Sequence, residues 1–156
     1  MTARRLGALL AAATLLAVSG CGESSGGAPD LAKLPLPPGA RITLKVERCD
    51  KGVNAFCAYE LVVTSPTAKN SETLANDENT LLLKNGWTGA NADDGEQRAA
   101  DSPGHKLRVT YASAFGDLKG IDLGWIKRSR KVTLALSRAL FAHTSAMSML
   151  LEVGAS

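Results

Sequence analysis

The chain has 156 residues, of which 45% are hydrophobic, 21% charged and 4% aromatic, and its formal net charge is +3. This length supports one small domain with a modest core. The weak net charge and the few aromatic side chains exclude the basic field and the stacking surfaces typical of nucleic-acid-binding proteins, so we predict no nucleic-acid partner.

The N-terminal segment has the pattern of an export signal. Arg4 and Arg5 precede an apolar run over residues 6–18, which is shorter than the roughly 20 residues that cross a bilayer. The run ends in Val18-Ser19-Gly20-Cys21, which resembles the lipobox of bacterial lipoproteins. An ordinary secretory signal peptide, without acylation, is the alternative.

The resemblance covers roughly the first 21 residues and implies a location, not an activity. It implies cleavage before Cys21, diacylation of this cysteine and attachment to the extracytoplasmic face of the cell membrane. Two or three acyl chains hold a protein durably, whereas one chain holds it only marginally. Loss of Arg4 and Arg5 with the signal peptide would leave 16 basic against 15 acidic side chains, which is nearly neutral.

Composition divides the rest of the chain. Residues 22–40 contain four prolines with glycine and serine at their start, which predicts a flexible and then extended spacer. We therefore expect a signal peptide over residues 1–20, a lipid-anchored tether over 21–40 and a single domain over 41–156.

The two remaining cysteines are predicted to pair. Export exposes Cys49 and Cys57 to an oxidising compartment, where a disulfide is the expected state. A zinc site would need further ligands, and His105 and His143 are distant in the sequence. We predict no metal and no other cofactor.

These cysteines flank a predicted β-hairpin. Residues 41–48 alternate apolar and polar side chains, and residues 59–63 repeat this pattern. Strict alternation places Cys49 on the polar side and Cys57 on the apolar side, so we expect a bulge or distortion near the loop.

A helix is expected over residues 70–85, with its N-cap at Asn70 or Ser71 and its end at Asn85-Gly86. Its thin apolar stripe consists of Leu74, Leu81 and Leu82. Asp77 and Glu78 are expected to face solvent.

The remaining elements are a strand and a long helix. Trp87 opens a possible short strand, and residues 91–104 resemble a polar loop. Residues 106–111 alternate as a strand, with Leu107, Val109 and Tyr111 inward.

A glycine-containing connection follows over residues 116–124. The alternative interpretation of this segment is a binding loop anchored by Trp125. Apolar-face positions then recur every three or four residues and predict one C-terminal helix, with a strand followed by a helix as the alternative; these positions are Val132, Leu136, Leu140, His143, Met147 and Leu150.

Together these elements predict an α+β fold: a small antiparallel sheet with an N-terminal disulfide-closed hairpin and helices packed on one face.

No set of residues in the sequence predicts catalysis. Asp101, Ser102 and His105 have the side chains of a hydrolase triad, but they lie within five positions and fit a turn better. The acidic residues 91–96 fail the EF-hand pattern, because alanines occupy ligand positions. We interpret His143, Met147 and Met149 as packing residues.

A basic cluster precedes and begins the predicted C-terminal helix: Trp125, Lys127, Arg128, Arg130 and Lys131. Cations at a helix N-terminus oppose the macrodipole, so another interaction has to favour them. A solvated surface is one interpretation. The other is contact with an anionic lipid or wall polymer, near which each basic residue gains about 1 kcal/mol.

The leading functional hypothesis is a non-enzymatic envelope lipoprotein, a binding or interaction module whose partners are membrane lipid, through Cys21, and an envelope protein or anionic polymer. The first alternative is an envelope enzyme, such as a hydrolase acting on cell-wall material. The second is a small-ligand-binding lipoprotein, although such proteins commonly have two lobes and longer chains.

Overall fold

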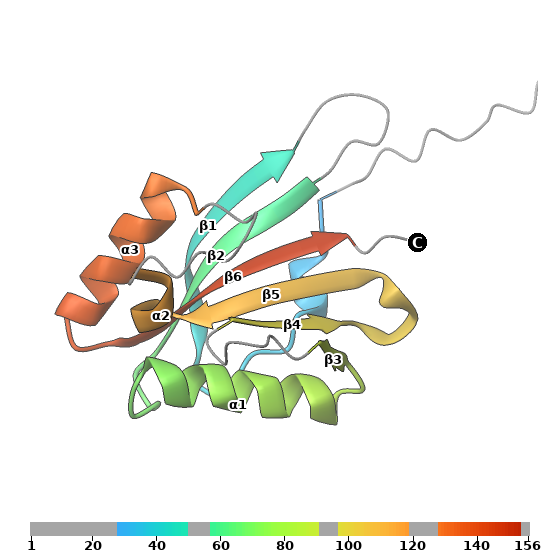
Figure 1. Cartoon of the computed structure of the whole chain (residues 1–156), viewed down its shortest axis with the longest axis horizontal. Coiled ribbons are helices and arrows are strands. Elements are labelled where there is room, and N and C mark those ends of the chain that lie inside the picture. The colour runs from blue at the N-terminus through green and yellow to red at the C-terminus, as the bar shows by residue number, and fades with distance from the viewer. Residues whose placement is uncertain (1–27, 50–56, 91–96, 119–127, 154–156) are drawn as a thin grey trace, which may run out of the picture.

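The computed structural model describes residues 28–49, 57–90, 97–118 and 128–153. Six strands form one antiparallel sheet in the order β1-β2-β6-β5-β4-β3 (Figure 1). The strands are β1 (Arg41–Cys49), β2 (Cys57–Ser65), β3 (Thr88–Ala90), β4 (Gln97–Asp101), β5 (Leu107–Ser113) and β6 (Ser145–Val153). The helices are α1 (Ser71–Lys84), α2 (Ala114–Leu118) and α3 (Arg130–Phe141), with short 3-10 turns η1 (Leu31–Lys33) and η2 (Pro103–His105). The predicted α+β class is confirmed.

The disulfide hairpin is confirmed as well. Cys49 lies directly opposite Cys57 in the β1–β2 ladder, and a disulfide joins them. The expected distortion near the loop is wrong, because the register shift lies at the far end of β1, between Ile42 and Leu44.

The two hairpin strands direct their apolar side chains to opposite faces of the sheet, which explains why the cysteines pair without a bulge beside them. Leu44 and Val46 of β1 pack with α3, whereas Tyr59, Leu61 and Val63 of β2 pack with α1 on the other face of the sheet. Strand β2 is buried on both faces. Cys49 therefore belongs to the polar side of its own strand and still shares a face with Cys57.

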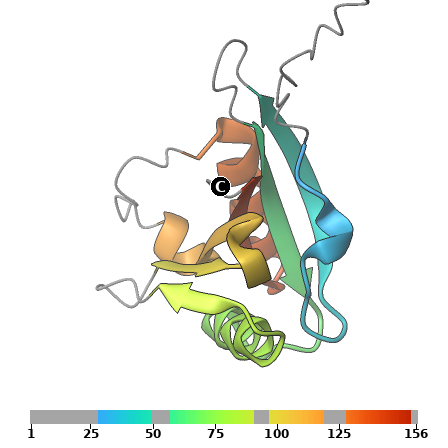
Figure 2. The same ribbon diagram turned by 90° about the vertical axis from the view of Figure 1, so that its right-hand side faces the viewer.

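Helices cover both faces of the sheet, which corrects the expectation of one covered face. Leu74 and Leu82 of α1 share one core with Leu34 and Tyr111. On the other face, Val132 and Leu136 of α3 form a second core; the strand and α2 residues that complete it are Val62, Ala114 and Ala146. Figure 2 shows the η1 segment and α3 on opposite sides of β1 and β2.

The predicted single C-terminal helix is wrong beyond residue 141. The chain turns at His143, whose φ is 58°, and continues as β6 between β2 and β5. Because β6 is buried on both faces, its apolar residues do not alternate, and their spacing resembles that of a helix. His143 is exposed in the turn instead of lying on an apolar face, whereas Met147 and Met149 are core residues as predicted.

The second half of the predicted tether belongs to the domain. Leu34 is 6% exposed within the α1 core, and Leu31 and Leu36 pack against it. This segment therefore packs against the α1 core through its leucines, to which the sequence interpretation gave too little weight.

Helix α1 has the predicted ends. The Asn70 side chain accepts a hydrogen bond from the Thr73 N–H at 2.7 Å, and Gly86 follows the helix with a φ of +78°. Residues 97–101, by contrast, form β4 and correct the expectation of a loop over 91–104. In the part of the chain that the structure describes, no helix has the length and apolar character needed to cross a bilayer.

Candidate functional site

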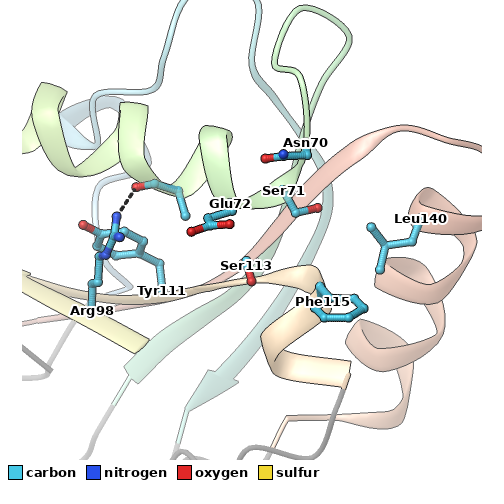
Figure 3. A pocket seen from close by; sticks show the side chains of 9 residues that line it. Asn70, Ser71, Glu72, Arg98, Tyr111, Ser113, Phe115 and Leu140 are labelled. Atoms are coloured by element: carbon cyan, nitrogen blue, oxygen red, sulfur yellow. Dashed lines mark hydrogen bonds between the residues drawn. The ribbon is translucent and has the colours of Figure 1, made fainter. Parts of the chain in front are cut away.

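A pocket of about 460 Å³ opens between α1, the end of β5, α2 and the end of α3 (Figure 3). Phe115 and Leu140 form an apolar wall where α2 and α3 approach each other. The remaining lining residues are Asn70, Ser71, Glu72, Ala75, Arg98, Tyr111 and Ser113. The pocket therefore joins an apolar wall to a mainly polar one.

Two serine hydroxyls in the pocket are positioned by the backbone. Ser71 Oγ accepts a hydrogen bond from the Ala146 N–H at 3.0 Å, and Ser113 Oγ accepts one from the Gly116 N–H at 3.1 Å. Since each hydroxyl accepts from the protein, its proton remains available to donate to a ligand.

Arg98 and Tyr111 are held in a similar way at the other end of the pocket. Arg98 donates to the Ala75 carbonyl at 3.1 Å and also bonds the side chain of Asn76, as Figure 3 shows in part. The Tyr111 hydroxyl donates to Asn79 Oδ1 at 3.0 Å, and burial raises its pKa, so it remains neutral. This wall is fixed before any ligand binds.

The chemistry of the pocket favours recognition. Among its described lining residues, Glu72 is the sole carboxylate, and histidine and cysteine do not occur. Ser71 and Ser113 thus have no imidazole there to activate them. The arrangement can bind a molecule that has an apolar part and hydrogen-bond acceptors.

The residues considered for a triad form a surface turn around η2. Asp101 binds the Arg108 guanidinium through both oxygens at 2.8 and 2.9 Å, and this contact lowers the pKa of the Asp101 carboxyl. Ser102 Oγ accepts from the Leu107 N–H at 2.9 Å. His105 lies 3.8 Å from Asp101 and is exposed, so these side chains serve the turn.

Arg128 occupies a different environment from the one expected for the basic cluster. Its side chain is 6% exposed, and Nε lies 3.4 Å from Asp117 Oδ2. Burial lowers the pKa of the guanidinium, whereas Asp117 and Glu60 favour its charge. Arg128 is therefore a buried charge inside the domain, which corrects its assignment to an exposed anionic-surface contact.

The other members of the basic cluster divide into two groups. Arg130 and Lys131 are exposed on the first turn of α3. Trp125 and Lys127 lie outside the described residues, as do Cys21, the acidic stretch 91–96 and the glycines 120 and 124.

Glu78 was expected to face solvent, and the structure places it in the interior. It is fully buried, neither carboxyl oxygen has a hydrogen-bond partner, and burial raises its pKa to about 8. A signal for burial was present, because Glu78 lies four residues from both Leu74 and Leu82 of the apolar stripe.

One group of three potential metal ligands occurs in the described part of the chain, formed by Glu47, Cys49 and Cys57. Because the two sulfur atoms are joined in the disulfide, they offer no thiolate to a metal.

Comparison of the chain with protein-family models, with curated proteins and with solved structures finds no match.

Proposed function

We propose that this protein is a bacterial envelope lipoprotein, anchored to the extracytoplasmic face of the cell membrane through acylated Cys21, and that its domain is a non-enzymatic binding module. The lipobox-like Val18-Ser19-Gly20-Cys21 supports the anchor. The pocket between α1, α2 and α3 supports the binding role.

The observation that carries the binding role is the combination of a fixed polar wall with an apolar one. Ser71, Ser113 and Arg98 are oriented by the protein's own backbone, so a ligand does not have to order them. The volume of about 460 Å³ lies in the range of small-molecule sites. A small amphiphilic ligand with acceptor groups fits this chemistry best.

A short connection would keep the module close to the bilayer. Because the chain packs on the domain from the η1 segment onward, at most ten residue steps separate Cys21 from the packed chain at Leu31. Fully extended, ten residues span at most about 35 Å. The pocket would thus encounter ligands at or near the membrane surface.

The anchor is tested by labelling cells with a palmitate analogue and separating membranes from soluble material. Label and membrane association are expected for the parent and for Ser24→Ala, a control in the same segment. Cys21→Ser should lose both. Unchanged membrane association of Cys21→Ser would contradict the anchor.

The pocket is tested with a neutral apolar dye such as Nile red and with native mass spectrometry of protein purified from membranes. Leu140→Trp should fill the pocket and abolish dye binding, because Leu140 lines it. Ser137→Trp, on the exposed side of the same helix, is the matched control and should bind normally. Equal binding by both variants would contradict the pocket.

The enzyme alternative makes a different prediction. Turnover of cell-wall fragments that disappears in Ser71→Ala or Ser113→Ala, with the fold unchanged, would replace the binding role by a hydrolytic one.

A further inference from the structure

The outward face of α3 combines large apolar side chains with cations. Leu134 is 49% exposed and Phe141 is 89% exposed. Arg130 and Arg138 lie four residues before and after Leu134, and Lys131 lies three residues before it, so the helical repeat places all of them on one face. We call this set, Arg130, Lys131, Leu134, Arg138 and Phe141, the α3 surface.

A groove of about 550 Å³ extends the α3 surface toward the edge strand β1. Arg41 contributes a third cation there beside Lys131 and Arg138, while Leu44 and Leu134 contribute apolar area. No carboxylate of the described chain lies within ion-pair distance of Arg41 or of the cations of the α3 surface. No described acidic side chain therefore neutralises these charges.

The described carboxylates are distributed unequally between the two faces of the sheet. On the α3 side, Glu60, Asp117 and Glu152 are buried. Asp101 shares this face through its register with Arg108, and its charge is paired with the Arg108 guanidinium. The exposed carboxylates lie on α1, on η1 or on the opposite face of β1, and are Asp30, Glu47, Glu72 and Asp77. The α3 side therefore presents mainly positive charge to a partner.

We propose that the α3 surface and its groove rest on the anionic headgroups of the phospholipid bilayer, with Leu134 and Phe141 entering the headgroup boundary. Apolar residues flanked by cations on a single helix face are typical of helices that lie in a membrane interface. Phosphate-bearing headgroups complement the unneutralised cations, and a bilayer accepts apolar side chains, which a soluble polyanion does not.

In one respect the inference rests on the proposed function, because the anchor and α3 would share one bilayer. The η1 segment and α3 lie on opposite faces of the sheet (Figure 2). The chain between Cys21 and Leu31, which extends to at most about 35 Å, would have to span this separation for the acyl chains and α3 to contact one bilayer together.

Vesicle sedimentation tests the proposal without the anchor, using the chain from residue 21 with Cys21→Ser. It should bind vesicles of phosphatidylcholine mixed with phosphatidylglycerol, bind pure phosphatidylcholine much less, and bind less at high salt. Each removed cation should weaken partitioning about fivefold, and the triple change Arg130→Gln, Lys131→Gln and Arg138→Gln about a hundredfold. The matched control, Lys69→Gln with Lys84→Gln and Lys106→Gln, removes the same charge elsewhere and should bind normally.

Insertion is tested separately with Phe141→Trp and brominated lipid. The fluorescence of the new indole should be quenched on binding. The indole of Leu83→Trp, at an exposed position of α1, should not be quenched. Equal binding to neutral vesicles, or equal weakening by the triple change and its control, would overturn the proposal. So would binding to polyphosphate but not to vesicles, which would indicate a soluble polyanion. Because these proteins carry no acyl chain, each of these three outcomes leaves the tests of Cys21 and of the pocket unaffected.

Discussion

The carboxylate of Glu60, in the middle of β2, accepts a hydrogen bond at 3.3 Å from the backbone N–H of Ser129, the residue that precedes α3. Its other oxygen accepts from Arg48 at 2.8 Å. Helix α3 has no acidic residue in its first turn, and a negative charge near a helix N-terminus stabilises the helix. Glu60 therefore supplies from the sheet the charge that the basic start of α3 lacks.

We expect Glu60→Gln to lower the free energy of unfolding by about 2–4 kcal/mol, because it leaves the buried Arg128 with less compensating charge. Urea unfolding measures this change. Glu47→Gln, on exposed β1, is the control and should change stability by less than about 0.5 kcal/mol. Equal losses in the two variants would show that Glu60 makes no special contribution.

Glu78 should make stability fall with rising pH. Its pKa is raised from 4.5 to about 8 in the folded chain, so above pH 4.5 the unfolded chain releases a proton that the folded chain retains. The part of the free energy of unfolding that depends on protonated Glu78 is fully present below pH 4.5. It falls by about 1.4 kcal/mol per pH unit as the pH rises toward 8.

The pH dependence of urea unfolding for Glu78→Gln checks this prediction. In this variant the free energy of unfolding should change little between pH 5 and pH 8, because an amide in the same position does not ionise. Glu72→Gln, on an exposed site of the same helix, should keep it. A parallel decline in Glu78→Gln would place the titration elsewhere.

The disulfide should stabilise the domain modestly, because the loop that it closes is short. The sequence separation of Cys49 and Cys57 is 8, for which the chain-entropy estimate is about 2.5 kcal/mol. Calorimetry of Cys49→Ser with Cys57→Ser should give a loss of that size with the fold retained. Addition of a reductant should destabilise the parent and leave the double variant unchanged.

The glycine after α1 should resist substitution. Gly86 has a φ of +78°, which a side chain disfavours, so Gly86→Ala should cost about 1 kcal/mol in thermal unfolding. Gly89 has no positive φ, and an added Cβ there would make only an ordinary contact, so Gly89→Ala is the control and should be close to neutral. Equal effects would exclude the backbone conformation as the cause.

The sequence predicted the elements whose burial follows one simple period. Strand β5 alternates with Leu107, Val109 and Tyr111 inward, and α1 has recognisable signals at both ends, so both are where expected. Strand β6 was missed because residues on both of its faces are buried, so periodicity does not distinguish it from a helix. Strand β4 was missed because Gln97–Asp101 has no β-branched or aromatic residue.

The candidate site was less predictable than the fold. The pocket unites Ser71, Arg98, Ser113 and Leu140, which come from four separate elements, and no local pattern connects them. The basic cluster was found as a run of charge, but only the structure separates buried Arg128 from exposed Arg130 and Lys131. Arg138 and Phe141 escaped notice because they lie beyond that run.

The central place of β6 has a consequence for how the chain folds. Strand β6 follows all other strands in sequence, yet it joins β2 to β5, with Ala58 opposite Glu152 on one side and Leu107 opposite Val153 on the other. The β1–β2 hairpin and the β3–β5 meander can form early from local contacts, but they stay separate until β6 enters between them. Pairings this distant in sequence slow folding. The edges of β2 and β5 therefore stay unpaired until residues 145–153 form β6 between them. A chain that ends before β6 would have a hairpin and a meander that no strand joins into one sheet.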